Sequence, residues 1–124
     1  MASRTYKAKR KNWRELPKEN QWVYGAIFKG KENSYIITNV KVTDEWEDSE
    51  IGADVIGYLV DPETICQDTG LTDKNGRKIF EGDCLGHKQN VVEYLSGSFV
   101  VSGDRPLSMM AKYNEVVGNI FDKE

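Results

Sequence analysis

Two segments of the 124-residue sequence contain side chains that could carry chemistry, and the first is the basic arm, residues 1–18. It holds seven cations against one acid, Glu15. Lysine and arginine at this density can bind a phosphate backbone, and the interleaved Tyr6 and Trp13 could stack on bases. We favour the simpler interpretation of a first strand whose aromatic rings pack on the domain, because acids dominate the remainder. The candidate binding surface is Arg4, Lys7, Lys9, Arg10, Lys11 and Arg14.

The second segment, residues 69–83, is rich in glycine, aspartate and asparagine. Asn75-Gly76 is a strong turn signal because both residues tolerate positive φ, and Asp73 can accept an Asx-turn hydrogen bond from the backbone two residues on. Asp73, Asn75, Glu81 and Asp83 could instead form a cation or ligand site, but the segment lacks the ligand spacing of a calcium loop. We therefore predict a structural turn motif. Its residues are Asp73, Asn75, Gly76, Gly82, Asp83 and Gly118, the last in a bulge of the final strand.

Catalytic and metal chemistry find little support in the sequence. Cys84 and His87 have a spacing that can chelate zinc, with Cys66 as a third ligand, but no fourth ligand is visible. Reduced thiols that fill the core are the simpler reading. One histidine without a nucleophile elbow gives no triad, and no phosphate-binding glycine loop is present. We expect no catalytic residues, no metal and no cofactor, while a metal-dependent enzyme that uses the 73–83 loop or Cys84 and His87 stays an alternative.

The charge of the chain is unevenly distributed. The net charge of -3 is the sum of +6 in residues 1–18 and -9 in the remainder, and residues 42–73 contain no basic side chain. The opposite charges could attract each other within one chain or between copies, so a homo-oligomer stays open. The sequence has neither the roughly 20-residue apolar run of a membrane helix nor the pattern of a secretory signal. We expect a cytoplasmic protein with no membrane partner.

Short apolar runs between dispersed glycines predict strands and turns rather than long helices. A helix is expected over 107–113, near Pro106, and an exposed acidic loop over 43–53. We divide the chain into 1–60, with the basic arm and a hairpin, and 61–124, although a single compact domain stays open. Strands are expected over 21–28, 34–42, 55–60, 91–95, 98–101 and 115–121, with two-residue turn Ser96-Gly97 in the clearest hairpin.

The sequence VDPETICQDTGLTDKNGRKIFEGD, residues 60–83, resembles the YopX family of small phage and prophage proteins. The resemblance returns at VGNIF, residues 117–121, and covers about half of the chain. It implies a phage or prophage origin and a setting in the host cytoplasm. It also implies a mainly β (α+β) fold of short antiparallel strands and one short helix, with a small barrel-like (SH3-like) C-terminal part. It implies no reaction and no catalytic residues.

These observations predict a non-enzymatic phage accessory protein that binds a host or phage macromolecule. Nucleic-acid binding through the basic arm is the first alternative, and a metal-dependent enzyme is the second. The sequence leaves the identity of the partner open.

Overall fold

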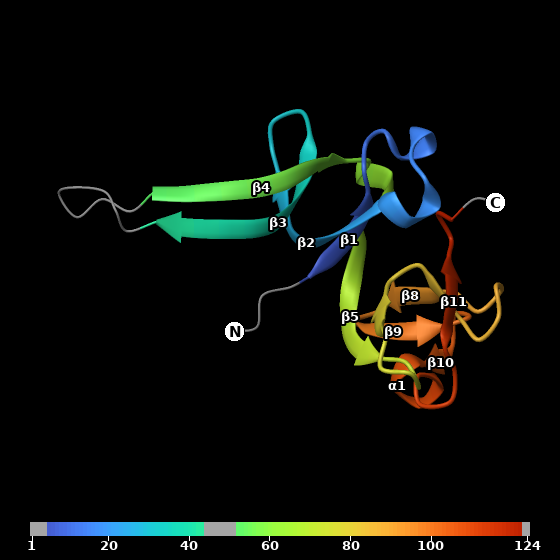
Figure 1. Cartoon of the computed structure of the whole chain (residues 1–124). Helices are drawn as coiled ribbons and strands as arrows, with labels where there is room; N and C mark the ends of the chain where they lie inside the picture. Colours follow the sequence, from blue (N-terminus) through green and yellow to red (C-terminus); the bar gives the residue numbers. More distant parts are fainter. Residues whose placement is uncertain (1–4, 44–51, 123–124) are drawn as a thin grey trace. The chain divides into compact units, whose positions relative to one another are not determined.

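The computed structural model describes residues 5–43 and 52–122 (Figure 1). The chain forms two compact units, Met1–Ile65 (unit 1) and Cys66–Glu124 (unit 2). In both units the described residues form antiparallel strands, and α1 (Leu107–Met110) is the one α-helix among them. The predicted mainly β fold with one short helix is therefore confirmed. Within the two described ranges, no helix has the length and apolar character that a membrane crossing requires.

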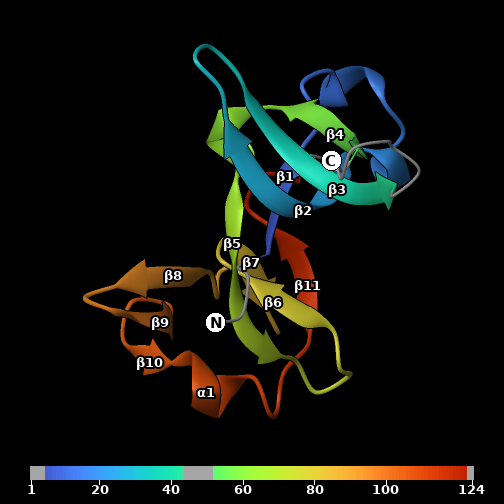
Figure 2. The same cartoon turned by 90° about the vertical axis from the view of Figure 1, so that its left-hand side faces the viewer.

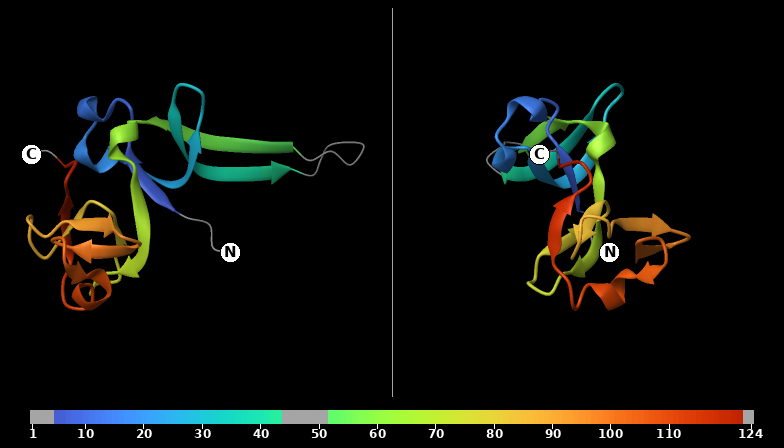
Figure 3. Two further views of the ribbon diagram at one scale, coloured as in Figure 1. Left: turned by 180° about the vertical axis from the view of Figure 1, so that it is seen from behind. Right: turned by 90° about the vertical axis from the view of Figure 1, so that its right-hand side faces the viewer.

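Unit 1 is built on antiparallel strands that lie in the order β4-β3-β2-β1: β1 (Tyr6–Lys9), β2 (Trp22–Lys29), β3 (Ser34–Thr43) and β4 (Gly52–Val60). The strands predicted over 21–28, 34–42 and 55–60 are confirmed as β2, β3 and β4. β3 and β4 run together as a long two-stranded ribbon (Figures 1 and 3). Most of the loop predicted over 43–53 lies outside the described residues, and its two ends belong to these strands.

Strand β2 changes its partner at Gly25. Tyr6 of β1 lies opposite Gly25, whereas the next residue, Ala26, lies opposite Ile37 of β3. Figure 2 shows the curved course of β2 that this exchange requires. A Cβ atom at position 25 would lie 2.0 Å from the carbonyl oxygen of Ile37, so only glycine fits at the exchange point.

One face of the unit 1 sheet forms a small core. Ala8, Ile36 and Val60 are almost fully buried there, and four partly buried apolar side chains pack against them. Because side chains alternate between the two faces of a strand, the neighbours of these residues lie on the other face. That alternation places Lys7 and Lys9 on the face of β1 away from Ala8.

Unit 2 consists of short paired strands around its own core. The hairpin predicted over 91–95 and 98–101 is confirmed, with Ser96 at φ 51° and Gly97 at φ 88° in its turn. The bulge predicted at Gly118 is also present, because the pairing register shifts there. The strands are β5 (Cys66–Thr72), β6 (Lys78–Phe80), β7 (Asp83–Leu85), β8 (Val92–Leu95), β9 (Ser98–Val101), β10 (Arg105–Pro106) and β11 (Val116–Asn119).

Within unit 2, β5 pairs with β6, β7 pairs with β11, and β8, β9 and β10 form a three-stranded sheet. No closed barrel is present among the described residues, so the SH3-like closure stays a prediction. The helix predicted over 107–113 is shorter than expected, since α1 ends at Met110. Seven buried apolar residues fill the core: Ile79, Leu85, Val92, Val101, Leu107, Ala111 and Val116.

Candidate nucleic-acid interface

Three lysines from two distant parts of unit 1 line one groove of about 230 Å³. Lys29 ends β2 and Lys31 lies in the turn between β2 and β3, where the Gly30 amide donates to the Asn33 carbonyl at 2.8 Å. Lys11 follows β1, and its amide donates to the carbonyl of Leu59 at the end of β4, at 2.9 Å. We call this set of lysines the basic groove. Its one acidic lining residue is Glu32.

Arg10 and Arg14, which lie close to Lys11 in the sequence, each pack against an aromatic ring. The guanidinium carbon of Arg10 lies 4.8 Å from the ring centroid of Tyr58, and that of Arg14 lies 4.3 Å from the ring centroid of Trp13. A ring beneath a guanidinium holds its plane while the N–H groups at the edge stay available for phosphate oxygens. Arg14 is exposed and Arg10 is half-buried.

Among residues 5–43 and 52–122, none of the five cations of these two sets has an ion-pair partner.

Lys7 and Lys9 were predicted to belong to the candidate binding surface, but both side chains are buried. Their exposed fractions are 4% and 0%, so a phosphate in solvent does not reach them. The Lys9 ammonium lies 3.9 Å from the Trp13 ring centroid, and that of Lys7 lies 4.7 Å from the Trp22 ring centroid. Cation–π contacts of this kind offset part of the cost of burying a charge. Both lysines therefore belong to the packing beneath the surface.

Trp13 anchors the segment that carries Arg10, Lys11 and Arg14. It begins the short 3-10 helix η1 (Trp13–Glu15), is buried, and its indole Nε1 donates to Asp61 Oδ2 at 3.3 Å. The Lys9 carbonyl accepts from the Asp61 amide at 2.8 Å, just before η3 (Pro62–Thr64). A second 3-10 helix, η2 (Lys18–Asn20), follows η1.

The two aromatic residues of the arm do not present free faces for bases. Trp13 is buried under Lys9 and Arg14, and Tyr6 packs against the core of unit 1. Arg4 lies outside the described residues. Of the six residues in the candidate binding surface, the structure leaves Arg10, Lys11 and Arg14 accessible.

Sequence reasoning missed Lys29 and Lys31. It assigned Lys29–Asn33 to a turn, and the turn is present over residues 30–33, while Lys29 ends β2 and pairs with Ser34. The available signal was the pair of lysines around Gly30 in a hairpin loop, which is a common arrangement for exposed charge. Nothing in that pattern indicated that the loop meets Lys11.

The sequence matches the YopX protein family over residues 12–123. The chain belongs to the YopX family. The match includes residues of both units and extends well beyond the half of the chain that 60–83 and 117–121 indicated. A comparison with curated proteins found no match. Membership in the YopX family assigns no binding partner or activity, so the function has to be argued from the residues.

The segment that carries the YopX resemblance contains a network of buried carboxylates. Asp73 Oδ1 accepts from the amides of Asn75 and Arg77, both at 2.9 Å, and Oδ2 accepts from the Val116 amide at 2.8 Å. The bond from Asn75 is the expected Asx turn. Gly76 adopts φ 82° in the same turn, and the Asn75 side chain donates to Glu115 at 2.8 Å. Asp73 thus ties the turn to β11.

Asp83 performs the same task one turn later. Its Oδ2 accepts from the Phe80 amide at 2.8 Å, and its Oδ1 accepts from the Asn119 side chain at 2.9 Å. Gly82 supplies the φ of 88° that brings the chain into β7. Asn119 Oδ1 in turn accepts from the Phe121 amide at 2.9 Å. These bonds show how both aspartates of the motif hold the backbone of unit 2.

The pKa of Asp73 lies below its ordinary value. Burial alone would raise it, but the hydrogen bonds from Val116, Arg77 and Asn75, together with the charge of Arg77, outweigh that effect. A carboxylate with a lowered pKa stabilises the folded state above its unfolded pKa of about 4, and this contribution is lost as pH falls through the folded pKa.

Replacing Asp73 by asparagine is expected to lower the free energy of unfolding by about 1–3 kcal/mol at pH 7. The asparagine oxygen can accept from only part of the three amides, and its NH₂ group would face an N–H donor. Urea unfolding of wild type and Asp73→Asn at pH 7, 5 and 3 measures the difference. The difference in the free energy of unfolding should become smaller below about pH 4, because only the wild type has a carboxylate at position 73 that becomes protonated there. A difference that is constant over this range would contradict the assignment.

The cysteines and the histidine of the alternative zinc site have different environments. Cys66 and Cys84 are buried and form no disulfide, whereas His87 is exposed and its Nδ1 accepts from the Gln89 amide at 3.2 Å. In the part of the chain that the structure describes, no three His, Cys, Asp or Glu side chains are grouped as metal ligands.

Proposed function

We propose that this YopX family member is a non-enzymatic protein that binds nucleic acid through unit 1. The observation that carries the proposal is the convergence of Lys11, Lys29 and Lys31 on one groove from two separate loops. Arg10 and Arg14, which flank Lys11 in the sequence, contribute two further cations to unit 1. In the phage or prophage setting that the family resemblance implies, the ligand would be phage or host nucleic acid in the cytoplasm.

The net charge of -3 does not oppose this proposal. Charges in solution are screened over about 8 Å at physiological ionic strength, so a bound phosphate responds mainly to the charges near it. Among the described residues that line the basic groove, the charged ones are three lysines and one glutamate, while Asp61 and Glu63 flank the lining residue Pro62. The lining itself therefore favours a phosphate in spite of the acidic average.

The character of the surface favours phosphate over an acidic protein segment. Lysines bind phosphate as mobile point charges, and arginines bind it through paired N–H groups. Phosphate contacts give affinity without reading sequence, so we expect sequence-independent binding with Kd values of about 1–100 µM near physiological salt.

Fluorescence anisotropy with a labelled mixed-sequence oligonucleotide of about 20 nucleotides tests the proposal. The full chain should bind it, and the double variant Lys29→Gln/Lys31→Gln should bind at least about tenfold more weakly, because two phosphate contacts are lost. The matched control is Lys74→Gln/Lys112→Gln, which removes two exposed lysines of unit 2 and should bind like the wild type. Absence of binding at 50 mM salt, or equal loss in both variants, would overturn the proposal.

A further inference from the structure

The face of the unit 1 sheet away from its core carries an exposed aromatic row. Phe28, Tyr35 and Leu59 lie opposite one another across β2, β3 and β4, so they share one face of the sheet. Phe28 is 58% exposed and Leu59 is 38% exposed, while Tyr35 is half-buried between them. We call these three residues the aromatic row.

The two rings of the row are tilted and do not stack face to face on each other. Their centroids are 6.2 Å apart and their planes are inclined by 47°, so they touch without covering each other. An antiparallel sheet normally turns polar side chains to water on its solvated face. An exposed aromatic row on that face therefore marks a surface for a partner.

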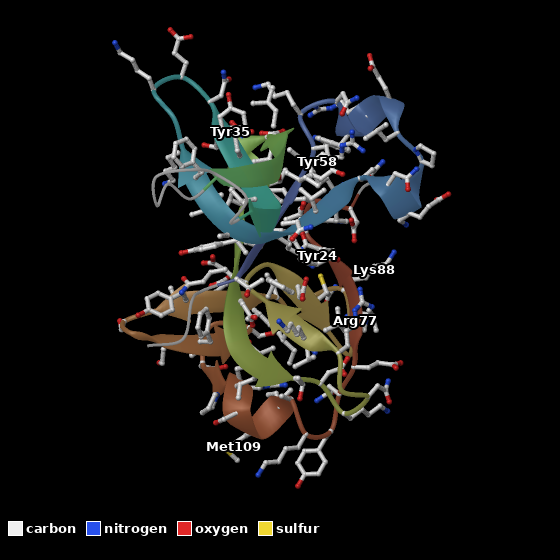
Figure 4. All side chains as sticks on the ribbon, turned by 60° about the vertical axis from the view of Figure 1, so that its left-hand side comes forward. Tyr24, Tyr35, Tyr58, Arg77, Lys88 and Met109 are labelled. Carbon is white, nitrogen blue, oxygen red and sulfur yellow. The ribbon has the colours of Figure 1, made fainter. Side chains whose placement is uncertain are left out.

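The aromatic row adjoins the basic groove at Gly30. Gly30 lines the groove beside Lys29 and Lys31. A Cβ atom at this position would lie 3.5 Å from the Tyr35 ring and 3.9 Å from the Phe28 ring. Figure 4 shows Tyr35 at the end of the sheet beside the β2–β3 turn that carries these lysines. The basic groove and the two rings of the aromatic row therefore come near each other at Gly30, in the turn between β2 and β3.

We propose that the ligand of unit 1 is a single-stranded nucleic acid, whose bases stack on Phe28 and Tyr35 while its phosphates lie in the basic groove. This inference rests on the proposed function and names its substrate class. A strand alternates phosphates and planar bases along its length, which is the complement of lysines beside exposed rings. In a duplex the bases are stacked inside and cannot reach the rings, so a duplex would use the lysines alone.

The variant Phe28→Ala tests the inference, with Phe28→Tyr as the conservative variant and Tyr113→Ala as a matched exposed aromatic of unit 2, 78% exposed. Each is titrated with a 20-nucleotide strand, the corresponding duplex, and an abasic strand of equal phosphate content. Loss of one stacked base costs about 5- to 150-fold in affinity. Phe28→Ala should lose affinity within this range for the normal strand and less than about twofold for the duplex and the abasic strand. Phe28→Tyr and Tyr113→Ala should bind like the wild type.

The outcomes separate the inference from the proposed function. If the wild type binds strand, duplex and abasic strand equally, or if Phe28→Ala binds the normal strand like the wild type, the stacking inference is wrong while the phosphate interface stands. If no oligonucleotide binds, the proposed function fails. If light scattering shows that Phe28→Ala converts a dimer into a monomer and leaves strand binding unchanged, the aromatic row is an interface between copies of the chain, and the stacking inference is overturned.

Discussion

Reversing the charge of the basic groove with Lys11→Glu/Lys29→Glu/Lys31→Glu should weaken nucleic-acid binding by about 1,000-fold near 0.1 M salt. For a single strand, each phosphate contact contributes about 0.7 to the slope of log affinity against log salt, so losing one costs about fivefold and losing three costs about 100-fold. Three introduced carboxylates add repulsion. Anisotropy titrations against a labelled strand measure the change.

This triple variant should fold normally, because all three lysines are exposed. The control Lys74→Glu/Arg105→Glu/Lys112→Glu makes the same change in net charge at three exposed positions of unit 2 and should lose less than about tenfold. Circular dichroism checks the fold of both. An equal loss of affinity in the two variants would show that total charge, and not the groove, governs binding.

The second large effect concerns stability, in the variant Gly25→Ala. The new Cβ would lie 2.0 Å from a backbone oxygen of β3, and backbone cannot move aside as a flexible side chain can. We expect a loss of at least about 3 kcal/mol, at the upper end of small-to-large substitutions. For a domain of this size, that loss lowers the unfolding temperature by about 12 °C or more.

Gly118→Ala is the matched control, since a Cβ there would meet no atom within 4 Å and glycine's positive φ is not required. Its unfolding temperature should stay within about 3 °C of the wild type. Thermal unfolding followed by circular dichroism compares the two. If Gly25→Ala unfolds at the wild-type temperature, β2 does not exchange partners as described.

The strands that the sequence predicted well are those with β-branched and aromatic runs, such as β2 and β9. Strand β5 was missed because Asp68, Thr69 and Gly70 are turn formers. In the structure the side chains of Asp68 and Thr69 replace some of the backbone hydrogen bonds between β5 and β6. Asp68 accepts from the Gly70 amide at 2.9 Å, and Thr69 donates to the Ile79 carbonyl at 2.7 Å. The pairing of β5 with β6 is accordingly irregular. Local residue propensities do not predict a strand that is stabilised mainly by contacts with neighbouring segments.

The candidate interface was predictable only in part. The high density of positive charge identified the arm as a candidate. The alternation of side chains along β1, however, places Lys7 and Lys9 on one face, where Trp13 and Trp22 cover them. The groove depends on a long-range contact between Lys11, two residues after β1, and Leu59 at the end of β4. Such a contact follows from the sheet order and not from any local pattern.

The most direct test of the account is the salt dependence of binding by the wild type and by Lys11→Gln/Lys29→Gln/Lys31→Gln. If Lys11, Lys29, Lys31, Arg10 and Arg14 each meet one phosphate of a single strand, log affinity should fall with log salt at a slope of about -3.5 for the wild type. The neutral variant should lose about 2 from that slope. Binding that does not depend on salt, or an identical slope for both proteins, would contradict a phosphate interface in the basic groove.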